Sequence, residues 1–318
     1  MTAPDPAAGA RTAMRVPEFF IIGHHKSGTT ALYEMLRRHA QLYLPDLKEP
    51  KFFDSDLHPL FKPSPASTKP RTYEQYLALF AAARPEQRIG EASPSYLRSE
   101  VAARAIADVQ PDARCIAILR EPASFVRSLH MQMVQEHAET EKDLRRAVEH
   151  EDIVRAGRRV HRYSDHVRYT EQLRRFHDVF GRERVLVLIY EDFRRDNAET
   201  LRAVLRFLEV DDTLEIEPRD ANPTVRVRSM RADRAVRNLY GEGGPVGRVV
   251  KPVVRALTPQ AARRAALRGL RRRVIYGSPR PADEALMAEL RSRYRPEVAS
   301  VSEYLGRDLI SRWGYGDE

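Results

Sequence analysis

Cysteine and long apolar runs are scarce in this chain, and both shortages restrict what it can be. Cys115 is the only cysteine among 318 residues, which excludes an intrachain disulfide and any zinc or iron–sulfur site built from cysteines. No stretch approaches the roughly 20 apolar residues that a membrane span needs, and residues 1–16 lack the apolar core of a signal peptide. We therefore expect a soluble, cytoplasmic protein with a flexible leader over residues 1–16.

Glycine and proline are also modest in number. With 15 glycines and 21 prolines, and with 42% hydrophobic against 31% charged residues, the chain is not collagen-like, mucin-like or wholly disordered. Its length is about twice that of a typical domain, so a sizeable core is expected. We find no internal repeat and no convincing linker, and we predict one domain over residues 17–318.

Negative charge is nearly missing from one segment. From Arg226 to Arg280 there are 15 basic residues against only Asp233 and Glu242, a net charge of +13 in a chain whose total is +9. Such a segment indicates a local anionic partner. The arginines lack interleaved aromatics and a recognised nucleic-acid module, so no nucleic acid is expected. We predict a basic helical insertion over about 226–275, a candidate for peripheral contact with an anionic membrane or an acidic acceptor.

Buried strands alternate with helices along the rest of the chain. Short apolar runs at 18–22, 115–119 and 185–189 are typical of buried strands. Helical patterns cover 164–180, with Ser164 as N-cap, and 198–208; a C-terminal helix starts near Pro281, is interrupted at Pro296 and ends by Gly306. This alternation predicts an α/β fold of the P-loop NTPase-like type, a central parallel sheet flanked by helices on both faces.

The first strand runs into a loop of small and basic residues that opens a helix. A helix N-terminus offers unpaired N–H groups and partial positive charge, and a glycine lets the backbone approach an anion. The order differs from the nucleotide-triphosphate pattern, because the lysine here precedes the glycine. The predicted phosphate-binding residues are Lys26, Ser27, Gly28, Thr29 and Thr30.

With these motifs the chain resembles the sulfotransferases that use 3′-phosphoadenosine 5′-phosphosulfate (PAPS), in particular their bacterial, carbohydrate and heparan-sulfate type branch. The resemblance extends over residues 18–313 and is weakest in the basic segment. It rests on the phosphate loop and on further segments that match in order: Lys48–Asp54, Glu91–Tyr96, Ile118–Ser128, Tyr190–Phe193 and Tyr294–Asp308.

The resemblance implies roles for single residues. Glu49, just ahead of a Phe-Phe pair, corresponds to the proposed general base, and Lys26 would neutralise the leaving phosphate. Arg120 and Ser128 correspond to the residues that bind the 3′-phosphate, and Arg280 to a loop that closes over it. The donor would be PAPS, the product 3′-phosphoadenosine 5′-phosphate (PAP), and no metal would be required.

Two of these positions can be examined from the residues alone. Arg120 leaves the end of a predicted parallel strand, where ligands of such sheets bind, and its guanidinium can grip a phosphate with two hydrogen bonds. Lys48 and Lys51 should favour the ionised form of Glu49 and lower its proton affinity, so His24 and His25 stay open as alternative bases.

One departure from the family is Ala92, where some carbohydrate-type members carry a lysine that helps to orient the reaction. Its absence leaves Lys51, or an arginine, as the substitute, and we therefore add Lys51 to the predicted catalytic residues.

The sequence favours sulfuryl transfer from PAPS to a hydroxyl, or an amine, of a carbohydrate, a glycolipid or a small natural product. Two alternatives remain open. One is an ATP-dependent small-molecule kinase of the P-loop type. The other is a non-catalytic binder of anionic lipid or nucleic acid that uses the basic segment.

Overall fold

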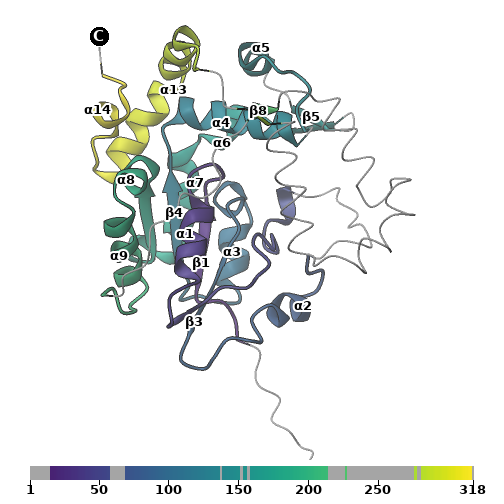
Figure 1. Ribbon diagram of the computed structural model, residues 1–318, viewed down its shortest axis with the longest axis vertical. Coiled ribbons are helices and arrows are strands. Elements are labelled where there is room, and N and C mark those ends of the chain that lie inside the picture. The colour runs from purple at the N-terminus through teal and green to yellow at the C-terminus, as the bar shows by residue number, and fades with distance from the viewer. Residues whose placement is uncertain are drawn as a thin grey trace, which may run out of the picture. The chain divides into compact units, whose positions relative to one another are not determined.

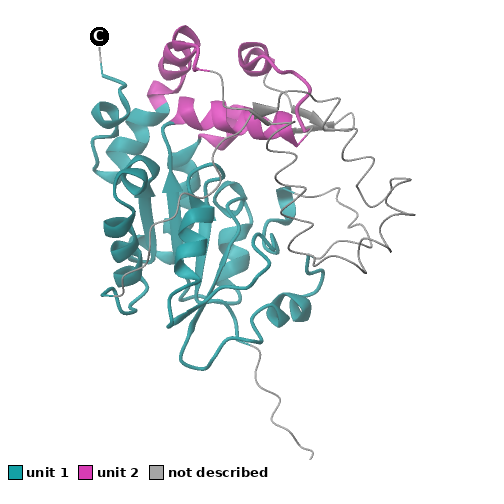
Figure 2. Ribbon diagram, in the orientation of Figure 1, with its two compact units in different colours: residues 1–121, 168–221, 297–316 teal, residues 122–167, 222–296, 317–318 magenta. Residues whose placement is uncertain are grey.

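The computed structural model describes residues 15–57, 69–136, 138–150, 153–155, 158–213, 226–227, 276–277 and 281–316. The chain divides into two compact units, coloured in Figure 2: unit 1 contains 1–121, 168–221 and 297–316, and unit 2 contains 122–167, 222–296 and 317–318. The leader over residues 1–14 and most of the basic segment lie outside the described residues. The domain boundaries expected from the sequence stay a prediction.

Unit 1 is built on a five-stranded sheet in the order β2-β3-β1-β4-β7 (Figure 1). Every neighbouring pair in it is parallel, which confirms the predicted parallel α/β sheet. The three strands expected from apolar runs are present, and two more, β2 and β3, were not predicted. The bounds are β1 Phe19–Gly23, β2 Leu42–Tyr43, β3 Arg88–Ala92, β4 Arg114–Leu119 and β7 Val185–Ile189.

Helices cover both faces of this sheet, as the alternating pattern predicts. On one face, side chains of β1 and β4 form a buried cluster with α1 (Thr29–Leu36), α8 (Tyr190–Arg195) and α9 (Asn197–Phe207). On the other, α7 (Tyr169–Phe180) contacts β4 and β7, and α3 (Ala102–Ala107) contacts α7. Shorter elements complete unit 1: η1 Ser55–Leu57, α2 Tyr73–Ala78, η2 Tyr96–Arg98, η3 Arg182–Arg184 and α14 Leu309–Trp313.

The sheet interior explains why the apolar runs were easy to recognise. All five residues of β1 are buried, and β4 is buried from its second residue onward. Strands enclosed on both faces need apolar side chains at every position, so they appear as continuous runs rather than alternating patterns. Cys115 lies in β4 with no solvent exposure, and burial raises the pKa of its thiol.

Unit 2 contains α4 (Pro122–Gln135), α5 (Leu144–Glu149) and α6 (Tyr163–His166), together with two small antiparallel strand pairs. The pairs are β5 (Ile153–Arg155) with β6 (Arg158–His161), and β8 (Arg226–Val227) with β9 (Tyr276–Gly277). The second pair joins residues at the two ends of the predicted basic insertion. None of the helices that the structure describes is both long enough and apolar enough to cross a membrane.

Two helix predictions were wrong in detail. The pattern over 164–180 is two helices, because the chain leaves helical geometry at Val167 and Arg168; the N-caps are Arg162 and Arg168, not Ser164, while Gly181 does end α7. The last long helix, α13 (Glu284–Leu305), runs through Pro296 without ending there. A proline inside a helix removes one backbone hydrogen bond and bends the axis, which the remaining bonds of a 22-residue helix can sustain.

Candidate active site

The loop between β1 and α1 has the backbone of an anion-binding turn. Gly28 caps the helix in the left-handed region, with φ of 86°, and a Cβ there would lie 2.9 Å from Cδ1 of Phe193. Both the backbone angle and the close packing therefore require glycine. The side chain of Ser27 is buried, and its hydroxyl donates to the carbonyl of His25 at 3.3 Å.

The first turn of α1 carries no acidic residue and no side-chain cap. The N–H groups of this turn are thus left for a ligand, and the partial positive charge of the helix end is not offset by a carboxylate. Thr29 is buried and Thr30 is half-buried within this turn. The sequence placed Lys26 to Thr30 at such a turn, and the structure has them there; their role in binding phosphate stays a prediction.

Arg120 braces this loop from the end of β4. Its Nη1 donates to the carbonyl of Lys26 at 2.8 Å, and its guanidinium carbon lies 4.7 Å from the ring centroid of Tyr190. Its buried Nε has no hydrogen-bond partner within the described part of the chain. Lys26 itself has a φ of 60°, a conformation that non-glycine residues adopt only where neighbours hold it. The predicted strand-end arginine therefore adjoins the predicted phosphate loop and shapes it.

The segment Lys48–Asp54 is attached to the end of β3, the strand next to β1. The N–H of Glu49 donates to the carbonyl of Ala92 at 3.0 Å, and the N–H of Lys51 donates to Oγ of Ser93 at 3.1 Å. The phosphate loop, Arg120 and Glu49 thus lie at the carboxyl ends of three neighbouring parallel strands, where ligands of open α/β sheets bind.

The carboxylate of Glu49 is surrounded by cations. Lys48 lies 2.8 Å and Lys51 3.4 Å from its two oxygens. Burial favours the neutral form, but His25, Lys48 and Lys51 together outweigh it and lower the pKa of Glu49 to about 2. The direction expected from the two lysines is confirmed. Glu49 is ionised at neutral pH, and it adjoins the phosphate loop through His25.

Both histidines of the phosphate loop are neutral at physiological pH. Burial lowers the pKa of His24 to about 4 and that of His25 to about 3. The Nε2 of His24 lies 2.7 Å from Oε1 of Gln172, and its ring packs 5.2 Å from that of Tyr169. Because an amide oxygen only accepts, this contact places the proton of His24 on Nε2. His24 is held by these contacts, whereas His25 lies close enough to Glu49 for each to influence the pKa of the other.

Two charged residues near Glu49 were missed. Lys69 lies close enough to Lys51, Glu49 and Asp54 for each to influence its pKa, which burial and Lys51 lower. Asp54 is fully buried at the end of the segment. No spacing in the sequence links Lys69 to a carboxylate twenty positions earlier, since only the folded loops bring them together. Lys51, proposed as the substitute for the lysine missing at position 92, does lie against Glu49.

Ser128 and Arg280 are not placed with these residues. Ser128 lies on α4, in unit 2, where its buried hydroxyl has no hydrogen-bond partner among the described residues. Arg280 lies outside the described residues. Their contact with a 3′-phosphate stays a prediction.

Glu191, which could imitate the magnesium-binding acid of a nucleotide hydrolase, is engaged elsewhere. Its Oε2 accepts from Nε1 of Trp313 at 2.9 Å, and its Oε1 accepts from the N–H of Glu121 at 3.2 Å. Both oxygens of Glu191 therefore serve structural hydrogen bonds, and Trp313 is buried.

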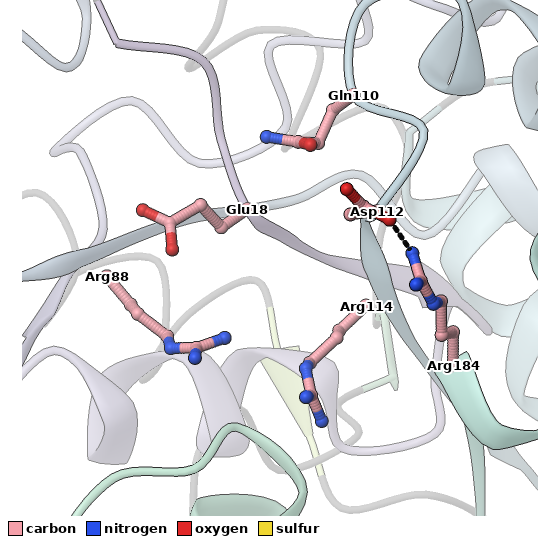
Figure 3. Close-up of a pocket in the computed structure, with 6 residues that line it drawn as sticks. All are labelled: Glu18, Arg88, Gln110, Asp112, Arg114 and Arg184. Atoms are coloured by element: carbon pink, nitrogen blue, oxygen red, sulfur yellow. Dashed lines mark hydrogen bonds and ion pairs between the residues drawn. The ribbon is translucent and has the colours of Figure 1, made fainter.

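A hollow of about 410 Å³ opens at the opposite edge of the sheet, where the strands begin (Figure 3). Its arginines stand at or just before the first residues of their strands and are ion-paired: Arg88 and Arg114 contact Glu209, and Arg184 contacts Asp112. Ligands of parallel sheets bind at the carboxyl ends, and paired arginines have little charge left for an anion. We therefore assign the site to the carboxyl edge.

Comparison with known proteins identifies the family of the chain. Residues 17–213 match the sulfotransferase family. A sulfotransferase structure from Alicyclobacillus acidocaldarius superposes with a TM-score of 0.66 at 25% identity, covering 94% of this chain and 99% of that one. The heparan sulfate glucosamine 3-O-sulfotransferase 6 of Mus musculus is 32% identical over 37% of this chain, and the membrane-associated sulfotransferase kil1 of Dictyostelium discoideum is 31% identical over 34%.

The match spans only 31% of the mouse enzyme and 21% of the Dictyostelium protein, so it supports the family and not their particular activities. The family match itself covers more than half of the chain and contains the phosphate loop, the Glu49 segment and Arg120. The chain therefore belongs to the sulfotransferase family.

Proposed function

We propose that this protein transfers the sulfuryl group of PAPS to a hydroxyl, or an amine, of a carbohydrate, glycolipid or small natural product. The observation that carries the proposal is the placement of an ionised carboxylate, Glu49, beside a phosphate loop whose helix N-terminus has no acidic residue. The phosphate loop suits a donor with an anionic leaving group, and the carboxylate suits an acceptor that must lose a proton.

The donor end of the reaction uses the phosphate loop. The N–H groups of the first turn of α1 and the ammonium of Lys26 would bind the 5′-phosphosulfate. The S–O bond to the phosphate breaks, and the phosphate keeps the electron pair. Fixed positive groups at the loop stabilise this growing charge, which is the main source of catalysis in transfers of this kind.

The acceptor end uses Glu49. The acceptor oxygen attacks sulfur in line with the leaving phosphate, forms the new S–O bond and gives its proton to a base. A carboxylate with a pKa of about 2 is fully available but binds a proton weakly. We expect its proton affinity to rise when the bound donor draws Lys48 or Lys51 toward its own negative charges.

The carbohydrate-type segment Lys48–Asp54 makes a sugar hydroxyl the first choice of acceptor. The name of the mouse relative, a heparan sulfate glucosamine 3-O-sulfotransferase, supports a hydroxyl-bearing sugar. The lysines around Glu49 fit an acceptor that is itself acidic, because their charge is only partly offset by one carboxylate.

The test is a titration of the full chain with PAP, ATP and ADP, read by the shift in thermal unfolding, followed by an acceptor screen with labelled PAPS in the presence of a chelator. A ligand that binds the folded state raises its apparent stability. We expect stabilisation by PAP, label transfer to a sugar acceptor, and loss of PAP binding in Lys26→Ala.

Two outcomes would contradict the proposal. Stabilisation by ATP but not by PAP, with a strict magnesium requirement, would indicate a kinase. Steeply salt-dependent binding to anionic vesicles or nucleic acid that survives Lys26→Ala, without turnover, would indicate a non-catalytic binder.

A further inference from the structure

Glu91 is a buried carboxyl group that the proposed reaction does not use. It lies in β3, with no solvent exposure, one residue before the carbonyl that accepts from Glu49. Burying a carboxyl group is unfavourable unless hydrogen bonds compensate it. Glu91 has such bonds: Oγ of Ser93 donates to its Oε2 at 3.0 Å, the hydroxyl of Tyr76 donates to its Oε1 at 3.3 Å, and Tyr96 is a third partner.

Two of these hydroxyls lead on to the Glu49 segment. Oγ of Ser93 accepts the N–H of Lys51 at 3.1 Å, and the hydroxyl of Tyr96 accepts the N–H groups of Phe52 at 3.0 Å and Phe53 at 3.3 Å. A hydroxyl has one proton and two lone pairs. When the proton is directed to Glu91, the lone pairs are directed to the backbone of the segment.

The segment has a conformation that must be held from outside. Glu49 has a φ of 60° and Lys51 a φ of 54°, both in the left-handed region that side chains other than glycine rarely occupy. Residues in this region persist only where the surrounding structure fixes them. Four backbone N–H groups of the segment, those of Glu49, Lys51, Phe52 and Phe53, bond to the carbonyl and hydroxyls at the end of β3 and the start of η2.

We propose that Glu91 is a positioning residue: through the hydroxyls of two neighbouring side chains it fixes the backbone that carries Glu49. The importance of Glu91 for turnover rests on the proposed function, but its stabilisation of the segment's backbone does not. Glu91 touches no reacting atom, and its effect is to keep the carboxylate of Glu49 beside the phosphate loop.

The protonation of Glu91 suits this role. The groups that face it are Tyr76 from α2, Tyr96 from η2, Ser93 beyond its own strand and Asp54 from the segment; burial raises its pKa to about 8. At neutral pH it is a neutral acid, which still has lone pairs to accept with and gains one proton to donate. A glutamine keeps one acceptor oxygen and supplies N–H donors on a neutral side chain of the same length, whereas a methionine has neither.

The two tyrosines provide a matched pair for the test. Both are fully buried and both hydrogen-bond to Glu91, but only the hydroxyl of Tyr96 also accepts backbone N–H groups of the segment. Tyr96→Phe therefore removes the hydroxyl that connects Glu91 to the backbone of the segment. Tyr76→Phe removes a hydrogen bond to Glu91 that does not connect it to that backbone.

The experiment is hydrogen exchange of the full-length chain, followed on peptides that cover residues 48–54, with α1 as internal reference. We expect exchange in the segment to accelerate at least tenfold in Glu91→Met and in Tyr96→Phe, and to stay within about twofold of wild type in Glu91→Gln and Tyr76→Phe. Exchange in α1 should not change in any of them. This readout needs neither donor nor acceptor, so it is independent of the proposed function.

Kinetic measurements then test whether stabilisation of the segment by Glu91 affects turnover. In Glu91→Met we expect kcat to fall about tenfold or more while the Kd of PAP is unchanged, with recovery in Glu91→Gln.

Equal exchange in the two tyrosine variants, or loss in Glu91→Gln equal to that in Glu91→Met, would overturn the proposal. If Glu91→Met does not fold, Ser93→Ala takes its place, since it removes the bridge to Lys51 and leaves Glu91. A wild type that fails to bind PAP would overturn the proposed function alone.

Discussion

At the scale of single residues, the carboxylate of Glu49 lies among more positive charge than an efficient base would need. Lys48, Lys51 and the adjacent His25 hold its pKa at about 2 against the effect of burial. The arrangement keeps Glu49 ionised at every physiological pH. It also ties the strength of the base to the positions of two flexible lysines.

Replacing Glu49 with glutamine should separate catalysis from binding. Because the amide cannot take the acceptor's proton, we expect Glu49→Gln to lower kcat by about 100-fold to 10,000-fold and to leave the Kd of PAP nearly unchanged. Turnover with labelled PAPS and a PAP titration measure the two quantities. The control is Glu86→Gln, an exposed, ion-paired glutamate ahead of β3. Full activity in Glu49→Gln would move the base to His25.

The pH dependence of activity should depend on the lysines beside Glu49. In wild type we expect no acid limb from Glu49 in kcat/KM between about pH 4 and pH 9, since its pKa of about 2 lies below that range. Lys48→Met removes the nearest cation and raises the pKa of Glu49, so activity should begin to fall at a higher pH than in wild type. Lys142→Met, at an exposed lysine of unit 2, is the control. An unchanged limb in Lys48→Met would show that Glu49 is not the titrating base.

At the scale of elements, the turn from β1 into α1 depends on Gly28. Gly28→Ala combines an unfavourable φ of 86° with a Cβ placed 2.9 Å from Phe193, so the loop must shift. We expect about 1–3 kcal/mol of lost stability and a weaker affinity for PAP. Gly306→Ala is a matched control, because it has a φ of 62° with nothing within 4 Å. It should lose stability only, by about 1 kcal/mol, and PAP binding that is equal in the two variants would contradict this account.

At the end of β4, the shape of the Arg120 side chain should matter as well as its positive charge. Arg120 uses one nitrogen for the carbonyl of Lys26 and stacks on Tyr190. Lysine keeps the charge but has neither the planar fork nor the stacking surface. We therefore expect Arg120→Lys to weaken PAP binding about tenfold with little change in kcat, as measured by isothermal titration and steady-state rates. A raised kcat or an unchanged Kd would argue against the bracing role.

The sequence predicted the three sheet strands that form continuous apolar runs and missed β2 and β3. β3 has the sequence Arg-Ile-Gly-Glu-Ala, which does not read as a buried strand. It is buried because Gly90 makes room for the ring of Phe19, where a Cβ would lie 2.1 Å from Cζ, and because hydroxyls satisfy Glu91. The contact with Phe19 is not visible in a window of sequence, because Phe19 lies in another strand, and the hydroxyl of Tyr76 reaches Glu91 only through the fold.

The candidate site divides in the same way. The phosphate loop and Arg120 were predictable, because a strand, a turn and a helix are local and a strand end has a fixed place in a parallel sheet. The proximity of His25 to Glu49 and that of Lys69 to Lys51 were not predictable, because each joins two loops. The division of the pattern at 164–180 into α6 and α7 was equally hidden, since neither a glycine nor a proline separates the two helices.

At the scale of the whole molecule, Glu91 should make stability fall as pH rises. Its pKa is about 8 in the folded state and 4.5 when unfolded, so between these values the folded state holds a proton that the unfolded state has released. The free energy of unfolding then decreases with pH, by at most about 1.4 kcal/mol per pH unit from this group. Glu91→Gln removes the titration and should flatten the slope in denaturant unfolding at several pH values. Glu86→Gln is the control, and identical slopes in wild type and Glu91→Gln would contradict the assignment.

The net charge of +9 is distributed unevenly along the chain, because the segment from Arg226 to Arg280 alone carries +13. Apart from Arg280, the residues to which we assign chemistry lie outside the basic segment, in a remainder with a net charge near −4. Contact of that segment with an anionic membrane or an acidic acceptor stays a prediction. Salt-dependent binding to anionic vesicles, compared in wild type and Lys26→Ala, would measure it independently of turnover.

The solitary cysteine makes the molecule convenient for site-specific labelling. Cys115 is enclosed in β4 and its raised thiol pKa leaves little thiolate, so maleimides should not react with the native protein. A single substitution at an exposed position, such as Ser55→Cys in η1, would then create the one reactive thiol. A fluorophore attached there sits one residue beyond Asp54, where its emission could follow the Glu49 segment in real time as donor and acceptor arrive.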